Sequence, residues 1–439
     1  MPGEDLFDPL LTTDELLAAT GSRAWLQAML DAEAALALAE ADVGVVPKGA
    51  AAAIVAACDA GRFDPAAIGR AGRAGGNPAS AVVDALLAEV DDEGRPWVHW
   101  GATSQDIVDT AAMLVVRRAG AIVDRELAGL ADGCADLAER HRDTVMAGRT
   151  LLRQALPITF GAKAAQWLMA VDDCRRHLAA AVDRAAVQLG GGAGTLAALG
   201  DDGPAVVTAF ATRLGLAEPV VPWATARQRV AEVAAALGIV AGTVAKVARD
   251  VALLMQDEVA EAFEAAAGRS STMPHKRNPV GAASADAAAR RAQALVPVLL
   301  GAIVAEHERG VGGWHAEWHA LAELLAFSGG AVATTARTVA GLQVDADAMA
   351  ANLARSGGRL LAERVVFALA PIVGRQEAAA AVKEAAARDG DFAAALTADP
   401  VAGRLGADRI RELLDPAGYL GASTTWVDRA LAAHRAEPR

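Results

Sequence analysis

The chain has 439 residues, of which 54% are hydrophobic and only 4% aromatic, and alanine and leucine dominate. This balance favours closely packed helices over sheets, because strands prefer β-branched and aromatic residues. The net charge of −13 argues against a nucleic-acid partner, which would need a basic face.

The cysteines and the N-terminal residues predict a soluble protein of the cytoplasm. Cys58, Cys134 and Cys174 are odd in number and form no CxxC pair, so neither a disulfide scaffold nor a zinc site is expected. The first residues are acidic where a signal peptide would be basic. The most apolar run, residues 292–305, contains Pro297 and is shorter than the roughly 20 residues of a membrane-spanning helix.

Residues 1–105 are predicted to form a small helical N-terminal domain. Thr12-x-x-Glu15 has the form of a capping box and is expected to open a short helix. Apolar residues then recur at the spacing of a helix with one buried face: Trp25, Met29, Ala32 and Leu36.

The first polar stretch of interest, residues 99–110, reads HWGATSQDIVDT. Thr103 or Ser104 can cap the helix that follows, with Asp106 favourably placed in its first turn. A capped helix N-terminus rich in hydroxyls is also a good carboxylate site, because free backbone N–H groups point outward there. A simple helix cap and a substrate site both remain open, and His99 is equally consistent with a satisfied structural histidine.

From about residue 103 to residue 344 the pattern predicts one long helix after another. Val244, Val247, Val251 and Leu254 have the spacing of a helix that packs lengthwise on its neighbours. There is no alternation of strands and helices, so the glycine cluster at 190–194 indicates a break between helices rather than a dinucleotide fold.

We therefore expect an all-α fold of three helical domains. They are an N-terminal domain of residues 1–105, a central long-helix bundle of residues 106–345, and a small C-terminal domain of residues 346–439.

A second polar stretch, residues 148–161, reads GRTLLRQALPITFG. Arg149 and Arg153 can each pair with a carboxylate through two parallel hydrogen bonds. A surface salt bridge is the alternative for either arginine.

The third stretch, residues 268–279, reads GRSSTMPHKRNP and has a dense set of polar side chains. Pro274 and Pro279 resist helix formation, so this stretch must be a loop. Binding and catalysis concentrate in loops held by a rigid scaffold. This basic loop in an acidic protein would attract a small anion, although a solvated basic turn remains the alternative.

Together the three stretches resemble the fumarase/aspartase (class II lyase) superfamily. The 268–279 loop is similar to its signature, a glycine, two serines and then Met-Pro-x-Lys-x-Asn, and the other two stretches resemble its other shared regions in the expected order. The resemblance spans essentially the full chain. It implies a central bundle that forms the core of a homotetramer, active sites shared between subunits, and no metal or cofactor.

The resemblance also implies a role for each matching residue. Ser270 is the expected proton-transfer residue, stabilised as an alkoxide by Lys276 and by loop amides. Lys276 and Asn278 are expected to hold a substrate carboxylate and to stabilise an enediolate-like intermediate. The remaining residues expected to bind substrate are His99, Thr103, Ser104, Arg149, Thr150, Arg153, Gln154, Ser271 and Met273.

One departure from the superfamily concerns the residue after the Arg-Thr pair. Lyases that expel an amine usually place a histidine there as general acid, whereas this chain has Leu151, and the nearby Gln154 has no titratable proton. Loss of the acid should cost an amine-expelling enzyme about 10²–10⁴-fold. A carboxylate is a stable anion and needs no acid, so this position favours the formation or opening of a lactone.

A second departure follows Glu308-Arg309. Adenylosuccinate lyases have serines and an arginine for the nucleotide phosphate in this region, whereas this chain has Trp314 and Trp318. These tryptophans either pack within the bundle or form an apolar wall of a small planar pocket.

In these features, and in the stretches SSTMPHKRNP, GRT-x-L and His-Glu-Arg…Trp-x-Ala-Glu-Trp, the chain resembles the bacterial 3-carboxy-cis,cis-muconate cycloisomerases. That resemblance implies cyclisation of a small tricarboxylate to carboxymuconolactone, in protocatechuate breakdown through the β-ketoadipate pathway. Gln154 stands where some members have a histidine, which leaves Ser270 as the main candidate proton donor. The alternatives are an adenylosuccinate-type or other fumarate-releasing lyase, and a catalytically silent structural oligomer.

Overall fold

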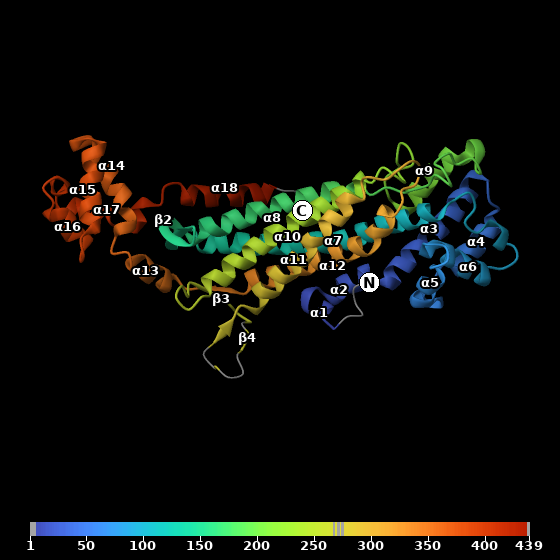
Figure 1. Ribbon diagram of the computed structural model, residues 1–439, viewed down its shortest axis with the longest axis horizontal. Coiled ribbons are helices and arrows are strands. Elements are labelled where there is room, and N and C mark those ends of the chain that lie inside the picture. Colours follow the sequence, from blue (N-terminus) through green and yellow to red (C-terminus); the bar gives the residue numbers. More distant parts are fainter. Residues whose placement is uncertain (1–5, 267, 270–272, 274–275, 437–439) are drawn as a thin grey trace. The chain divides into compact units, whose positions relative to one another are not determined.

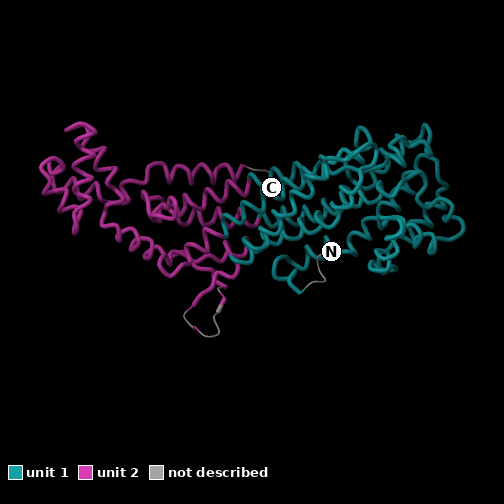
Figure 2. Tube along the Cα trace, viewed as in Figure 1, with its two compact units in different colours: residues 1–128, 173–248, 283–335 teal, residues 129–172, 249–282, 336–439 magenta. Residues whose placement is uncertain are grey.

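The computed structural model describes residues 6–266, 268–269, 273 and 276–436 (Figure 1). Almost all regular structure in these residues is helical, which confirms the expected all-α class. Two compact units are present, each built from segments distant in sequence (Figure 2). Unit 1 comprises residues 1–128, 173–248 and 283–335, and unit 2 comprises residues 129–172, 249–282 and 336–439. The division into three consecutive domains remains a prediction.

Unit 1 contains the N-terminal helices, which pack around α3. The predicted inward face of α3 is buried at all four of its positions, Trp25, Met29, Ala32 and Leu36. The helices wholly in unit 1 are α1 (Asp8–Leu11), α2 (Asp14–Thr20), α3 (Ser22–Val43), α4 (Lys48–Ala57), α5 (Pro65–Ala71), α6 (Pro78–Glu89) and α9 (Gly203–Leu214), with 3₁₀ turns at Ala60–Arg62, Arg95–Trp97 and Gly200–Asp202.

The expected capping box at the start of α2 does not form. Thr13, and not Thr12, caps the helix, since its side chain accepts a hydrogen bond from the Leu16 N–H at 3.3 Å. The Thr12 hydroxyl donates instead to the backbone oxygen of Ala326 at 2.6 Å. Glu15 pairs with Arg125 through two hydrogen bonds, which leaves its carboxylate unavailable for the box.

Five longer helices contribute residues to both units. They are α7 (Ser104–Arg140), α8 (Phe160–Asp183), α10 (Gln228–Leu254), α11 (Val280–Gly301) and α12 (Gly313–Ala340). The positions that the sequence predicts to be buried on α10 are all buried: Val244, Val247, Val251 and Leu254. By length and composition α10 could cross a membrane, but 56% of its apolar window is buried, as in the core helix of a folded protein.

Unit 2 combines short strands with the C-terminal helices. Its described strands form three antiparallel pairs, β1 with β2, β3 with β6 and β4 with β5. The strands are β1 (Val145–Thr150), β2 (Arg153–Thr159), β3 (Ala262–Glu264), β4 (Gly268–Arg269), β5 (Arg277–Asn278) and β6 (Leu342–Val344). The helices are α13 (Ala346–Ala354), α14 (Ala362–Val373), α15 (Arg375–Ala387), α16 (Phe392–Ala398), α17 (Ala407–Leu413) and α18 (Ser423–Ala436), with 3₁₀ turns at Arg359–Leu361, Ala402–Leu405 and Pro416–Tyr419.

Candidate active site

The residues expected at the site divide between the two units. His99, Thr103 and Ser104 belong to unit 1. The other described site residues belong to unit 2: Arg149, Thr150, Arg153, Gln154, Met273, Lys276 and Asn278. Ser270 and Ser271, expected to transfer the proton and to bind substrate, lie outside the described residues.

In unit 1 the start of α7 combines a capped helix end with a cation. The Thr103 N–H donates to Asp106 Oδ2 at 3.0 Å, so among the described residues the carboxylate of Asp106 makes the capping contact, and not the predicted hydroxyl of Thr103 or Ser104. The Thr103 hydroxyl accepts a hydrogen bond from Arg309 Nη2 at 2.9 Å. A hydroxyl, an exposed guanidinium and the N-terminus of a long helix are favourable for an anion. The sequence pattern did not assign Arg309 to the site, because it lies 206 residues from Thr103.

Asp106 also holds the glycine cluster next to this helix start. Its Oδ1 accepts from the Gln188 amide and from the Gly190 N–H, both at 3.0 Å, and Oδ2 accepts from the Gly191 N–H at 2.9 Å. Burial raises the pKa of Asp106, although these hydrogen bonds act to lower it. The cluster lies between α8 and α9, which confirms the predicted break between helices. The glycine cluster also supports the 99–110 stretch through its hydrogen bonds to Asp106. The spacing of the glycines did not indicate this role.

The His99 ring is held from one side only. Its Nδ1 lies 2.7 Å from Oε1 of Glu33 on α3, whereas Nε2 has no hydrogen-bond partner within the described part of the chain. Burial lowers the pKa of His99, but the charge of Glu33, the hydrogen bond to it and the charge of Asp106 outweigh burial, so the pKa is raised. His99 is thus anchored like a structural histidine but keeps one nitrogen available.

Trp314 belongs to a buried polar network. Its indole N–H donates to Asp109 Oδ1 at 2.9 Å. The Arg227 guanidinium lies between Asp109, at 2.7 and 3.0 Å, and Glu317, whose Oε1 accepts from Nε at 2.9 Å. This tryptophan therefore fits the first interpretation, packing within the bundle.

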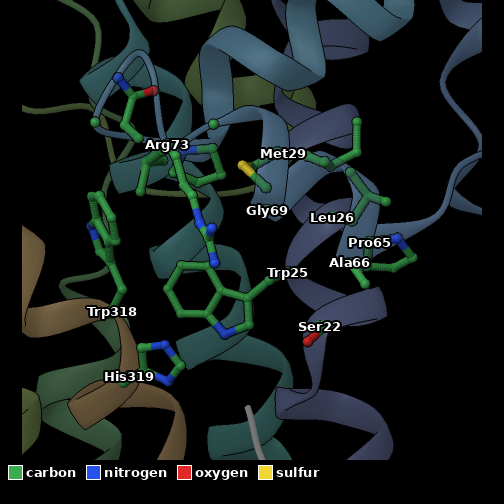
Figure 3. Close-up of a pocket in the computed structure, with 16 residues that line it drawn as sticks. Ser22, Trp25, Leu26, Met29, Pro65, Ala66, Gly69, Arg73, Trp318 and His319 are labelled. Carbon is green, nitrogen blue, oxygen red and sulfur yellow. The ribbon is translucent and has the colours of Figure 1, made fainter.

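Trp318 fits the second interpretation, the wall of a pocket. A pocket of about 500 Å³ lies in unit 1 among α3, α5, α7 and α12, and Trp318 and Trp25 line it (Figure 3). Arg73 extends toward the ring of Trp25, and His319 also lines the pocket (Figure 3). Apolar walls with a few polar groups are usual for a small-molecule site.

In unit 2 the 148–161 stretch forms the hairpin of β1 and β2, where the sequence pattern predicted no strand. Thr150 pairs with Arg153, so Leu151 and Leu152 form a two-residue turn with φ values of 50° and 64°. Such φ values are unusual for bulky residues, and hairpin turns normally use glycine or asparagine there. The two leucines are 97% and 76% exposed. The tip of this hairpin is therefore strained, apolar and without a titratable group.

The two-pronged pairing expected of Arg149 is made with a carboxylate of the protein itself. Its Nη1 and Nη2 donate to the two oxygens of buried Glu261 at 2.7 and 2.6 Å. Asn352 donates to the same carboxylate at 2.8 Å, and the Gln154 amide donates to the Asn352 backbone oxygen at 3.1 Å. Arg153 is exposed, and its guanidinium has no partner among the residues that the structure describes. Arg153 is therefore more available than Arg149 to a carboxylate of a ligand.

We expect Arg149→Lys to lower the free energy of unfolding by about 1–3 kcal/mol, because lysine cannot form two parallel hydrogen bonds to buried Glu261. Urea unfolding measures this loss. Arg153→Lys on the partner strand is the matched control, and it should leave unfolding unchanged while weakening substrate binding. Equal stability of the two variants would show that the Glu261 pair does not anchor the hairpin.

The ends of the 268–279 loop are fixed by β4 and β5, in which Gly268 pairs with Asn278. Lys276 and Met273 are exposed, and the Lys276 N–H donates to the Met273 backbone oxygen at 3.0 Å. The Lys276 ammonium has no partner among the described residues. A cation that no other described residue pairs is suited to meet an anionic ligand.

Glu264 anchors the same loop, because it bonds to residues that follow it in the chain. It is buried, and its carboxylate accepts from the Gly281 and Ala282 N–H groups at 3.0 and 2.7 Å, which caps α11. The Arg277 guanidinium lies over the Phe263 ring at 4.6 Å and donates to the Glu264 backbone oxygen at 3.3 Å. Glu264, which precedes the loop, is thus bonded through its carboxylate to the start of α11 and through its backbone oxygen to Arg277. Within the described residues, no group of three or more His, Cys, Asp or Glu side chains could hold a metal ion.

Comparison with known proteins agrees with this fold. A model of the lyase family matches residues 11–294, and a model of the adenylosuccinate lyase C-terminus matches residues 358–430. A 3-carboxy-cis,cis-muconate cycloisomerase of Pseudomonas aeruginosa is 47% identical, over 99% of this chain and 98% of the relative. A nitrosuccinate lyase of Streptomyces davaonensis is 45% identical, over 97% of this chain and 94% of the relative.

A solved structure shows the same fold. The 3-carboxy-cis,cis-muconate lactonizing enzyme from Pseudomonas putida has a TM-score of 0.92 and 41% identity, and the match covers 98% of this chain and 99% of that one. A long-helix fold with this set of polar stretches defines a class II lyase. The chain belongs to the fumarase/aspartase lyase superfamily.

Proposed function

We propose that the protein is a 3-carboxy-cis,cis-muconate cycloisomerase. In this reaction one carboxylate of the tricarboxylate adds to a carbon–carbon double bond, and the electrons move toward the carbon beside a second carboxylate. A proton then bonds to that carbon, and carboxymuconolactone forms without loss of any atom. The similarity to relatives named for this activity supports the proposal over the full chain.

The observation that carries the proposal is the turn of the β1–β2 hairpin. Leu151 follows the Arg-Thr pair, is almost fully exposed and has no proton to donate. An amine leaves poorly without protonation, and loss of a general acid costs about 10²–10⁴-fold. A carboxylate attacks or leaves as a stable anion. The absence of an acid at this position is therefore compatible with lactone chemistry and poorly compatible with expulsion of an amine.

The proposed roles follow the charge of the substrate. Ser270 transfers the proton, and Lys276 with Asn278 stabilises the enediolate-like anion. Arg153 and the Arg309 guanidinium at the start of α7 are cations available for further carboxylates.

We also propose a homotetramer in which each active site draws on three subunits. Apolar side chains stay exposed on α10 and around the C-terminal end of α11, which supports burial between copies: Ile239, Leu253, Val298, Leu300, Ile303 and Val304. Light scattering on the purified protein measures the oligomeric state, and a stable monomer with full activity would contradict this arrangement.

A second candidate is the elimination of nitrite from nitrosuccinate, which would leave fumarate. The relative named for nitrosuccinate is nearly as similar as the cycloisomerases. Nitrite also leaves as a stable anion, so Leu151 suits both reactions. An adenylosuccinate-type reaction has less support, because Trp314 and Trp318 occupy the region of the expected phosphate-binding residues.

Parallel assays with the three substrates separate these reactions. We expect loss of the ultraviolet absorbance of 3-carboxy-cis,cis-muconate with no fumarate formed. Nitrite released from nitrosuccinate at a higher kcat/KM would replace the proposal with the second candidate. Faster release of fumarate from adenylosuccinate would overturn both.

A further inference from the structure

Glu33 is a buried carboxylate with a single hydrogen bond among the described residues. The residue lies on α3 and is 1% exposed, and its Oε1 lies 2.7 Å from Nδ1 of His99. Its Oε2 has no partner among the described residues. A buried carboxylate is costly unless it is neutral or paired with a cation. In this surrounding the partner able to carry that positive charge is the imidazole of His99.

Glu40 is the second buried carboxyl group of α3. Glu40 lies two turns further along α3 and is fully buried with both oxygens unpartnered in the described structure. Burial, with a further contribution from Glu33, raises the pKa of Glu40 to about 9, so Glu40 is uncharged at neutral pH. The pKa of Cys58 is likewise raised by burial and then by Glu33 and Asp31.

His99 shows the opposite response to the same environment. The charged groups that act on it are Glu33 from α3 and Asp106 from α7, and together they raise its pKa in spite of burial. The imidazolium form therefore persists to a higher pH than in an ordinary histidine. The side chain is 17% exposed, and Nε2 has no partner among the described residues.

The backbone of His99 has an unfavourable conformation that needs a contact to hold it. His99 has a φ of 59°, and Gly101, just before Thr103, has a φ of 69°. A left-handed histidine costs free energy and persists only where its surroundings hold it. The ion pair with Glu33 is a contact able to do this, so the ring has a defined direction in the 99–110 stretch.

We propose that Glu33 is a positioning residue of the active site. It fixes the His99 ring through Nδ1 and pairs with the positive charge of the imidazolium, so that Nε2–H is presented to a carboxylate of the substrate. This inference rests on the proposed function, which places His99 at the substrate. Glu33 itself does not touch the substrate.

Glu33→Gln tests the proposal, because it keeps a hydrogen-bond acceptor of the same shape but removes the charge. We expect the His99 pKa, followed by NMR of ¹³C-labelled histidine and assigned with His99→Gln, to fall. The alkaline limb of kcat/KM for 3-carboxy-cis,cis-muconate should move to lower pH by the same amount. KM at neutral pH should rise about tenfold, while kcat changes less.

The matched control is Glu40→Gln on the same helix. Because Glu40 is already uncharged, the control should leave the His99 titration and KM unchanged. Glu33→Asp keeps the charge at a greater distance and should shift the alkaline limb of kcat/KM part of the way. This variant provides a folded comparison if Glu33→Gln is unstable. An unmoved His99 titration in both Glu33 variants, or an unmoved KM, would overturn the proposal.

A separate measurement distinguishes this inference from the proposed function. Tricarballylate is a tricarboxylate probe whose binding calorimetry does not depend on turnover. If muconate is not converted, the proposed function fails. Weaker tricarballylate binding in Glu33→Gln than in Glu40→Gln, together with the lowered His99 pKa, still supports the role of Glu33, and equal binding refutes it.

Discussion

Ser270→Ala is expected to lower kcat by about 10²–10⁴-fold, because alanine has no hydroxyl to carry the proton to the carbon beside the carboxylate. Ser270 belongs to the 268–279 stretch, whose ends are fixed by β4, β5 and Glu264, so the helices should be unaffected. The ultraviolet assay measures kcat, while circular dichroism and light scattering check helicity and assembly.

Ser271→Ala is the matched comparison at the adjacent position. The resemblance assigns Ser271 to substrate binding, so its loss should raise KM with a smaller effect on kcat. A Ser270→Ala enzyme with near-normal kcat would show that another group transfers the proton. If kcat falls equally in both variants, the two hydroxyls act together and the separate roles assigned to them are wrong.

The helices could be predicted because burial follows their period. Ile107, Ala111 and Leu114 on α7 are all buried, as their spacing indicates. The hairpin of β1 and β2 could not be predicted in this way. Its turn has leucines at positive φ in place of glycine or asparagine, so the usual turn residues are missing. Contacts distant in sequence hold this turn, among them the pair of Arg149 with Glu261.

Contacts between residues distant in sequence also limit how much of the site could be predicted. The motifs identify residues that carry chemistry, but a motif does not contain its partners. Glu33 is 66 residues from His99, and Glu261 is 112 residues from Arg149. The pairing of Arg149 also shows why residue type alone is ambiguous, since a guanidinium suited to a substrate carboxylate is equally suited to one from the protein.

Arg227→Met is expected to lower the free energy of unfolding by about 3–5 kcal/mol, because it leaves the carboxylates of Asp109 and Glu317 buried without their cation. The guanidinium is 2% exposed and bonds to both carboxylates. Urea unfolding measures the loss. Arg290→Met is the control, since its pair with Asp286 is on the surface and contributes about 0–1 kcal/mol.

The pH dependence of the stability loss in Arg227→Met distinguishes an unpaired buried charge from lost packing. Burial raises the pKa of Glu317, and the hydrogen bond and charge of Arg227 act to lower it. Without Arg227 the pKa of Glu317 rises further. A carboxyl group whose pKa is higher in the folded than in the unfolded state binds a proton on folding, so lower pH favours the folded state. The stability loss of Arg227→Met should therefore shrink as the pH falls through this raised pKa.

Neutralising the two carboxylates gives the decisive comparison. Asp109→Asn and Glu317→Gln, combined with Arg227→Met, should recover most of the lost stability, because a neutral buried group costs less than an unpaired charge. Arg227 also lies over the Trp223 ring at 5.0 Å, so any remaining loss measures that packing. No recovery in the triple variant would mean that Arg227 stabilises unit 1 by filling space and not by balancing charge.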